Sequence, residues 1–290
     1  MLACLLALSG ATRIAAADAP FANGKWIDLT HDFSTNTLYW PTAKPFTLET
    51  EFHAHTDKGY FYAANRYAAS EHGGTHIDAP IHFNEHGQTL DQLPVEQLTG
   101  EAIVVDVSAK AATNADYLIS VDDLKAWETK HGRIPKGAIV LFHTGYAKRW
   151  PDAKSYLGTD ERGPGAVAKL HFPGLDPAAA RWLVAERPIK AVGLDTASID
   201  YGQSTLFESH CILFAKSIPA FENVAALDQL PAKGAYVVAL PMKIKDGSGG
   251  PLGDNQVLAN DVSYIRQVVL GNLPAIPAGV QFQAADVNLD

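Results

Sequence analysis

The sequence predicts a single compact α/β domain with a mixed β-sheet. Short, continuous apolar runs recur along the chain, as they do in strands that are buried on both faces of a sheet. Segments with helix-start residues alternate with these runs. The 290 residues are 47% hydrophobic and no linker rich in proline or serine divides them, so they can bury one substantial core.

The first predicted strands enclose a helix. Residues 102–107 (A-I-V-V-D-V) and 138–142 (A-I-V-L-F) are the apolar runs expected of buried strands. Between them, Ser120 is a good N-cap for a helix that ends near Gly132.

A second helix and two further strands follow. Asp176 and Pro177 form a typical helix start, and Pro188 closes the helix. Residues 189–194 and 235–240 are predicted strands. This alternation of strands and helices supports the α/β assignment.

Three histidines and an aspartate are concentrated in one short segment, S-E-H-G-G-T-H-I-D-A-P-I-H-F, as His72, His76, Asp78 and His82. Protonated histidines this close would repel one another, and buried neutral ones would each need a hydrogen-bond partner. A divalent cation removes both problems, because neutral imidazole and carboxylate are its natural ligands. The segment predicts a metal site, and the alternative is a polar surface loop.

The spacing favours an extended chain over a helix. The four residues occupy even positions and would share one face of a strand. Gly73 and Gly74 weaken a helix, and Pro80 removes one of its hydrogen bonds. We therefore expect a glycine-rich turn that leads into an irregular or edge strand.

The motif H-G-G-T-H-I-D-A-P-I-H-F resembles the H-x-G-T-H-x-D-x-P-x-H-F signature of the metal-dependent cyclase family, which includes bacterial kynurenine formamidases and isatin hydrolases. The similarity extends from about Trp26 to about Ile244. It includes the softer motifs G-Q-T-L-D-Q-L-P, L-F-H-T-G, V-G-L-D-T-A-S-I-D and S-H-C-I-L-F-A-K-S-I-P-A-F-E-N. The resemblance implies a compact architecture of the swivelling β/β/α type.

The resemblance also implies that a later histidine and a later glutamate, His210 and Glu222, complete the site. One ion, Mn²⁺ or Zn²⁺, would be held by His72, His76 and Asp78. Where a second ion is present, its ligands would be Asp78, His82, His210 and Glu222. With a single ion, His82 would be free to act as a proton shuttle.

Such a site predicts a hydrolase. Metal-activated water would attack the carbonyl carbon of an amide, aryl-formamide, lactam or cyclic imide and cleave its C–N bond. The catalytic proton would be handled by His82 or Glu222.

Residues around the metal are harder to assign. The imidazoles need hydrogen-bond acceptors, and the candidates are Asp195, Asp200 and Ser70. Trp40, Phe61 and Phe207 are candidates for an aromatic substrate pocket.

Two other classes of function stay open. Two histidines and a carboxylate also form the facial triad of non-haem metal oxygenases, and a non-catalytic exported metal-binding protein would keep the same ligands. A Cys-His nucleophile pair is not expected, because Cys211 follows His210 directly and adjacent residues on a strand point to opposite faces. Cys211 is instead predicted to be a buried structural thiol.

The composition indicates which kinds of partner the chain can bind. A formal net charge of −9 and the lack of a basic patch argue against nucleic acid. The apolar N-terminal stretch is too short to span a bilayer. We expect a small-molecule amide or lactam substrate, no membrane span, and the homodimer or homotetramer that the family resemblance suggests.

The two ends of the chain predict separate segments. Residues 2–8 are apolar and 15–17 are three alanines, as in a cleavable export signal, although a basic n-region is missing. We expect a signal peptide over residues 1–17, a hydrolase domain over 18–259 and a C-terminal extension over 260–290. The location expected is periplasmic or secreted.

Overall fold

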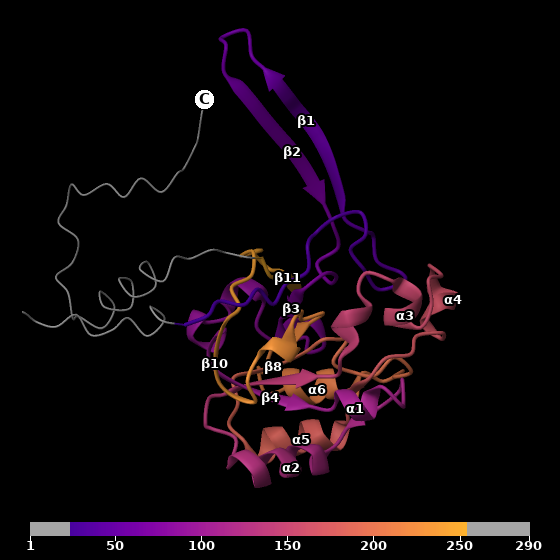
Figure 1. The fold of residues 1–290 in the computed structure, drawn as a ribbon, viewed down its shortest axis with the longest axis vertical. Helices are drawn as coiled ribbons and strands as arrows, with labels where there is room; N and C mark the ends of the chain where they lie inside the picture. The colour runs from indigo at the N-terminus through magenta and orange to yellow at the C-terminus, as the bar shows by residue number, and fades with distance from the viewer. Residues whose placement is uncertain (1–23, 254–290) are drawn as a thin grey trace, which may run out of the picture. The chain divides into compact units, whose positions relative to one another are not determined.

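Among residues 24–253, which the computed structural model describes, seven strands form one mixed sheet (Figure 1). Their order is β10-β4-β6-β8-β9-β3-β11. The four central strands run parallel to one another: β4 (Thr99–Asp106), β6 (Ile139–His143), β8 (Ala191–Leu194) and β9 (Ala220–Glu222). The three outer strands are antiparallel to their neighbours: β10 (Lys233–Val238), β3 (His76–Asp78) and β11 (Gly249–Pro251).

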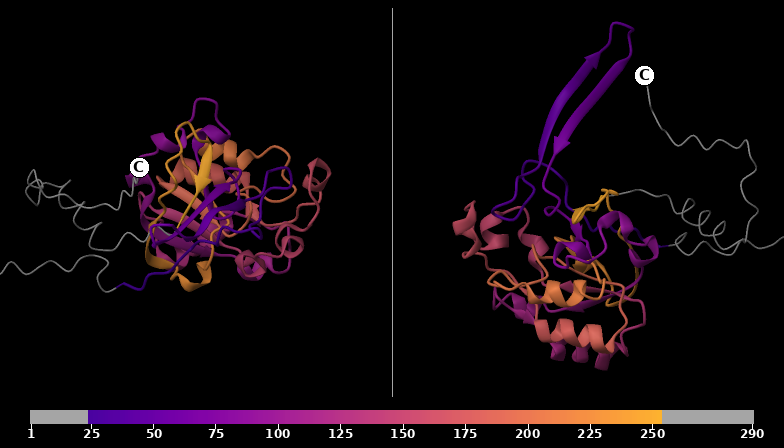
Figure 2. Two further views of the ribbon diagram at one scale, coloured as in Figure 1. Left: turned by 90° about the horizontal axis from the view of Figure 1, so that it is seen from above. Right: turned by 180° about the vertical axis from the view of Figure 1, so that it is seen from behind.

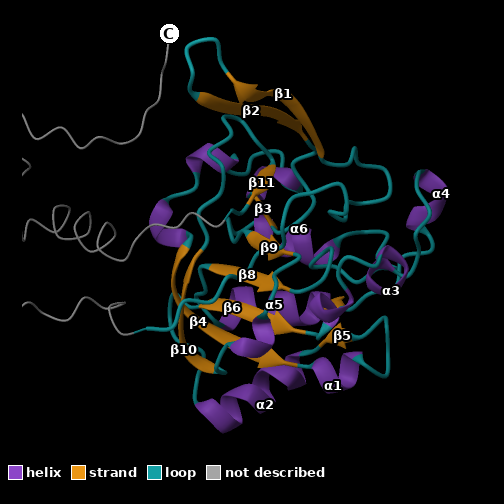
Figure 3. Cartoon of the chain, turned by 45° about the horizontal axis from the view of Figure 1, so that its top comes forward, coloured by secondary structure: helices purple, strands orange, loops and turns teal. Residues whose placement is uncertain are grey.

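The sheet is buried on both faces, which explains the continuous apolar runs in its strands. On one face, Ile103 and Val105 of β4 belong to an apolar cluster with the helices α2 (Val121–His131), α5 (Pro177–Glu186) and α6 (Glu208–Phe214). On the other face, Val104 packs with a second apolar cluster that includes Leu141 and Phe221. Figure 1 shows α2 and α5 side by side along the first face, and Figure 3 shows the strands of the sheet in the order given above.

The helix starts predicted from the sequence are confirmed. Ser120 caps α2 in a capping box, because its hydroxyl accepts from the Asp123 N–H while the Asp123 carboxylate accepts from the Ser120 N–H at 2.7 Å. Asp176 caps α5 by accepting from the Ala178 N–H at 2.7 Å, and Pro177 occupies the first turn.

Short elements complete the described chain. They are the helices α1 (Ser108–Ala111), α3 (Ala153–Leu157) and α4 (Pro164–Val167), and a small parallel pair of strands, β5 (Leu118–Ile119) and β7 (Gly174–Leu175). Single 3₁₀ turns cover Pro80–His82, Leu90–Gln92, Val95–Gln97, Tyr146–Arg149 and Leu227–Gln229.

An antiparallel hairpin, which the sequence pattern did not predict, is formed by β1 (Thr47–His55) and β2 (Phe61–Ala68). Figure 1 and the right-hand view of Figure 2 show it extending away from the rest of residues 27–253. Every residue of its two strands is exposed except Ala64, which is half-buried.

The fold confirms the predicted mixed α/β domain, since residues 27–253 form one compact unit. The expected signal peptide (1–17) and C-terminal extension (260–290) lie outside the described residues. Within residues 24–253, every helix is too short or too polar to cross a bilayer.

Candidate metal centre

The site is built on two neighbouring strands of the sheet. His76 and Asp78 are the first and last residues of β3, so their side chains leave the same face of the strand. Glu222 ends β9 and lies directly opposite His76 in the antiparallel pairing. Strand geometry alone therefore brings these three side chains together.

The other three candidates come from outside the strands. His72 precedes β3, in the glycine-rich loop. His82 ends the 3₁₀ turn that Pro80 begins, and His210 lies on α6. The predicted even-spaced face is thus a true strand only from His76 to Asp78.

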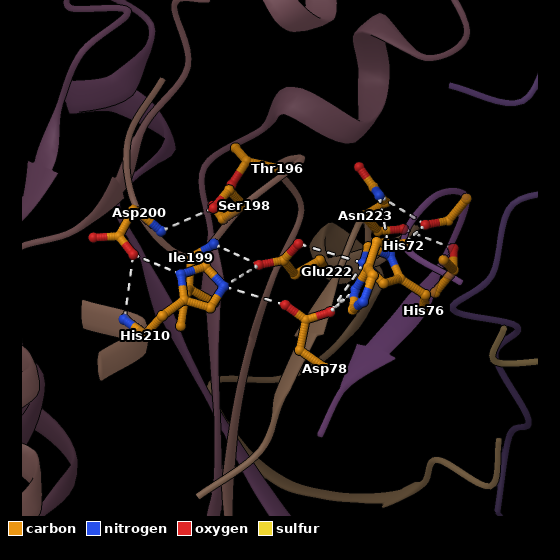
Figure 4. A network of polar contacts seen from close by, with 12 residues as sticks. His72, His76, Asp78, Thr196, Ser198, Ile199, Asp200, His210, Glu222 and Asn223 are labelled. Atoms are coloured by element: carbon orange, nitrogen blue, oxygen red, sulfur yellow. Dashed lines mark hydrogen bonds and ion pairs between the residues drawn. The ribbon is translucent and has the colours of Figure 1, made fainter. Parts of the chain in front are cut away.

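Asp78 is the centre of the cluster, as Figure 4 shows. One carboxylate oxygen, Oδ1, lies 2.7 Å from His72 Nδ1 and 3.1 Å from His76 Nε2. The other, Oδ2, lies 3.1 Å from His210 Nε2. The same His210 Nε2 lies 3.2 Å from Glu222 Oε1.

His82 completes the cluster by stacking on His72, with 3.8 Å between ring centroids. Potential ligand atoms in the described chain fall into two compact groups, each with all atoms within 4.8 Å of one another. These groups are His72 with Asp78 and His82, and His76 with Asp78 and Glu222. The six ligands expected from the sequence all lie together.

Hydrogen bonds orient two of the imidazoles toward the carboxylates. His76 Nδ1 donates to the Gly74 carbonyl at 3.0 Å, and Gly74 can present that carbonyl because its φ is +60°. His210 Nδ1 donates to Asp200 Oδ2 at 2.6 Å. Each ring therefore points Nε2 into the cluster.

A third contact ties the site to the end of the described chain. His72 Nε2 lies 2.9 Å from Ser248 Oγ, and the Ser248 hydroxyl donates to Glu71 at 2.6 Å. The following strand, β11, pairs with β3. Sequence reasoning missed Ser248 and Glu71, because the contact spans nearly the whole domain; the G-S-G-G-P turn was its only local signal.

The charges of the cluster are strongly coupled. Burial opposes ionisation of Asp78, but the charge of His72 and hydrogen bonds from His210 and His72 outweigh it, so the pKa of Asp78 is well below its ordinary value. Burial and the neighbouring charge of Asp78 raise the pKa of Glu222. Burial lowers the pKa of His82 to about 4, which keeps that imidazole neutral at pH 7.

The donors fit a divalent cation. His76 Nε2 is buried and has no hydrogen-bond partner, although Asp78 Oδ1 and Glu222 Oε2 lie 3.1 and 3.5 Å away. A buried acceptor nitrogen that faces two carboxylates is costly unless something positive lies between them. Imidazole and carboxylate are the donors that zinc and manganese accept.

Among the three proposed hydrogen-bond acceptors, Asp200 contacts a histidine of the cluster. Asp195 instead accepts from the N–H groups of Thr144 and Gly145 at 2.7 and 2.8 Å, and so shapes the turn after β6. The Ser70 hydroxyl accepts from the Lys44 N–H at 3.0 Å. The sequence could not rank these three acceptors, because the tertiary fold decides how deeply each is buried and which groups it contacts.

A cavity of about 300 Å³ opens onto the cluster. Trp40, Phe83, Leu157 and Phe207 contribute apolar walls, and Trp40 and Phe207 have ring centroids 6.2 Å apart. Phe61 does not line this cavity, because it begins β2 and is exposed on the hairpin. Two of the three predicted pocket aromatics therefore reach the site.

The prediction for Cys211 is wrong. His210 and Cys211 lie on the helix α6, where adjacent residues are about 100° apart, and Cys211 is exposed. His210 points into the cluster while the thiol faces outward, so the pair still does not form a nucleophile with its base.

The chain is similar to known proteins of one family. A family model described as "Putative cyclase" matches residues 27–201. Isatin hydrolase from Roseibium aggregatum is 33% identical over 234 residues, covering 78% of this chain and 84% of that protein. Kynurenine formamidase from Bacillus cereus is 27% identical over 234 residues, covering 79% and 95%.

The fold is similar to solved structures as well. Isatin hydrolase A from Ralstonia solanacearum superposes with a TM-score of 0.70 at 36% identity, and the match covers 78% of this chain and 89% of that one.

Proposed function

The chain belongs to the cyclase family of hydrolytic enzymes, and from this premise we propose how its polar cluster cleaves an amide C–N bond and on which substrates. The substrate is a small amide whose nitrogen or ring carries an aryl group: an aryl-formamide, lactam or cyclic imide. The relatives are named for isatin, an aryl lactam, and for a formamide of kynurenine, an arylamine.

One observation carries the proposal. The unpartnered Nε2 of His76 and the carboxylates of Asp78 and Glu222 meet at the cavity that Trp40 and Phe207 line. A donor set for a cation thus adjoins a flat apolar space that suits an aryl group.

The six side chains that would hold the cation are His72, His76, Asp78, His82, His210 and Glu222. Their mixture of imidazole nitrogen and carboxylate oxygen favours Zn²⁺ or Mn²⁺ over Mg²⁺ or Ca²⁺. When bound, a divalent cation lowers the pKa of water and polarises a carbonyl. Asp78 contacts the most imidazoles and serves as the common ligand if two ions bind.

Where a single ion is held by His72, His76 and Asp78, His82 is free of the metal and is the group best suited to move a proton. It lines the cavity, and its lowered pKa of about 4 leaves it neutral and able to accept a proton at pH 7. Glu222 is the alternative, because its pKa is raised from the ordinary value toward neutral pH. Either group would take a proton from the attacking water and pass it to the departing nitrogen, so that the carbonyl becomes a carboxylate and the nitrogen becomes an amine, or an amide when the substrate is an imide; in a lactam or cyclic imide both groups stay in one product.

Three further proposals concern the setting of the enzyme. The apolar run and three alanines within residues 1–17 support export to the periplasm or beyond. Residues 260–290 form an extension beyond the hydrolase domain. The working form is a homo-oligomer.

The test is hydrolysis by the purified chain. Metal content is measured, and N-formylkynurenine, isatin and a simple anilide are assayed for acid release with and without added Zn²⁺ or Mn²⁺. We expect turnover that depends on the metal. The variant His76→Ala should lose both bound metal and turnover, whereas His86→Ala, at an exposed position, should keep both.

Two results would overturn the proposal. One is a His76→Ala enzyme with unchanged metal content and turnover. The other is oxygen consumption without acid release, which would indicate the facial-triad chemistry of an oxygenase.

A further inference from the structure

Asn223 directly follows Glu222 at the end of the F-E-N motif and is buried beside the metal cluster (Figure 4). Its φ is +53°, in the left-handed region that asparagine adopts more readily than most residues. Its N–H donates to the Thr196 carbonyl at 2.8 Å, and its own carbonyl accepts from the Thr75 hydroxyl at 2.7 Å. The backbone of Asn223 is therefore fixed on both sides, so its carboxamide has a defined direction.

The nitrogen of this carboxamide holds the carbonyl on which His76 depends. Asn223 Nδ2 donates to the Gly74 carbonyl at 2.7 Å, and His76 Nδ1 donates to the same oxygen at 3.0 Å. The two nitrogens lie 3.4 Å apart, side by side on one acceptor. The oxygen of the carboxamide could not replace its nitrogen here, because two carbonyl oxygens 2.7 Å apart would repel each other.

A buried phenol sets the other end of the carboxamide. Tyr156 Oη lies 2.8 Å from Asn223 Oδ1 and 3.1 Å from the Asp195 carbonyl oxygen. Burial raises the pKa of Tyr156 well above its ordinary value, so the hydroxyl keeps its proton and stays a donor. With its oxygen bound to Tyr156, Asn223 turns its nitrogen toward Gly74.

The Gly74 carbonyl needs this support. Gly74 has a φ of +60°, and a glycine peptide turns with little steric resistance because it carries no Cβ. If the carbonyl turned away, His76 Nδ1 would lose its acceptor, and the ring could rotate or move its proton to Nε2. A protonated Nε2 cannot bind a cation.

We propose that Asn223 is a positioning residue: its carboxamide, oriented by Tyr156, holds the Gly74 carbonyl and thereby keeps Nε2 of His76 free to bind the metal. The inference rests on the metal site of the proposed function, but not on the identity of the substrate. It also means that the end of β9 supplies one ligand, Glu222, and supports a second ligand on β3.

The test is the Zn²⁺ affinity of the purified full chain, measured by competition with a chelator. Asn223→Gly removes the carboxamide but keeps a backbone that tolerates this φ, and it should bind Zn²⁺ about 10- to 100-fold more weakly than the wild type. Ser217→Gly is the matched control, because Ser217 also has a positive φ, +54°, but belongs neither to the cavity nor to the metal cluster. It should bind Zn²⁺ like the wild type.

Thermal scans separate positioning from general support of the fold. Zn²⁺ raises the melting temperature by an amount that its affinity sets. If Asn223 only supported the fold, Asn223→Gly would lower the melting temperature equally with and without Zn²⁺, and the gain would be unchanged. A positioning role makes the gain smaller.

Tyr156→Phe tests the chain of contacts while the carboxamide stays in place. It should weaken Zn²⁺ binding about two- to tenfold, the effect of one lost hydrogen bond. In the Asn223→Gly background it should change the affinity little, because the phenol acts through the carboxamide.

Three results would overturn the proposal: an unchanged Zn²⁺ affinity in Asn223→Gly, an unchanged thermal gain, or an equal effect of Tyr156→Phe in both backgrounds. If Asn223→Gly does not fold, an unchanged affinity in Tyr156→Phe alone overturns it. Weakened Zn²⁺ binding by these variants of a chain that hydrolyses no amide would refute the proposed function and still support this inference.

Discussion

Asp200 Oδ2 lies 2.6 Å from His210 Nδ1, and this contact turns the opposite nitrogen of the ring toward Asp78 and Glu222. The same carboxylate also accepts from the backbone N–H groups of Ser209 and His210 at 3.1 and 3.2 Å. Asp200 therefore fixes both the start of α6 and the direction in which its histidine points.

The first prediction concerns this carboxylate. Asp200→Ala should weaken metal binding by about 10- to 100-fold, because His210 loses the acceptor that orients its ring. Asp200→Asn, which keeps an acceptor oxygen, should lose less. Isothermal titration of the metal-free protein measures both affinities. Asp176→Ala removes a carboxylate that accepts from backbone N–H groups at another helix start, away from the cluster, and it should bind metal like the wild type.

The second prediction concerns Ser248. Ser248→Ala should weaken metal binding by about tenfold, since it removes the hydroxyl that links His72 to Glu71. Glu71→Gln should have a smaller effect of the same sign. Metal competition with a chromogenic chelator gives the affinities. If Ser248→Ala matched the wild type, the link would be dispensable for holding His72.

The third prediction concerns pH. Burial lowers the pKa of His210, but hydrogen bonds to Asp200, Asp78 and Glu222 prevail and raise it well above its ordinary value. Its protonated form therefore stabilises the metal-free fold below the ordinary histidine pKa, and this contribution is lost as the pH rises through the raised value.

The melting temperature of the metal-free protein should therefore fall as the pH rises from the ordinary histidine pKa of about 6.5 through the raised pKa of His210. The gain on adding Zn²⁺ should grow over the same range, because metal binding requires neutral imidazoles and releases protons. Thermal scans with and without Zn²⁺ measure both trends. A metal-free melting temperature that climbs with pH would contradict the assigned charge states.

The fourth prediction concerns the cavity wall. Trp40→Ala should raise KM for aryl amides by about tenfold and change kcat little, because it removes apolar contact that substrate and transition state share. Initial-rate kinetics on an anilide measure the effect. A small aliphatic formamide serves as the matched control substrate. An equal rise in KM for that substrate would mean that the substitution disturbs more than the apolar wall of the cavity.

Much of the sheet could be predicted, because strands that are buried on both faces appear in the sequence as continuous apolar runs. The A-I-V-V-D-V and A-I-V-L-F runs correspond to β4 and β6, and the polar residues Ser120 and Asp176 mark the starts of α2 and α5. The even spacing of His76 and Asp78 gave the shared face correctly, since side-chain direction in a strand follows from sequence separation alone.

The hairpin of β1 and β2 could not be predicted in this way. Its segments T-L-E-T-E-F-H-A-H and F-Y-A-A-N-R-Y-A carry apolar residues on both faces, so the contrast that marks a half-buried strand is absent. His210 was wrongly expected on a strand, because its helix also lacks a local signal in the sequence. The N-cap of α6 is Phe207, whose φ is +48°, and Asp200 accepts from N–H groups in the first turn; neither feature has a local signature in S-H-C-I-L-F.

The position of β3 between β9 and β11 has a consequence for biosynthesis. Both flanking strands follow it late in the described sequence, so a ribosome will have made nearly the whole domain before either can pair with His76 and Asp78. Until then the histidine-rich segment offers metal-binding side chains but has no fixed structure. Loading with metal should therefore be one of the last events in maturation, and a nascent chain that stalls before Glu222 should emerge without its ion.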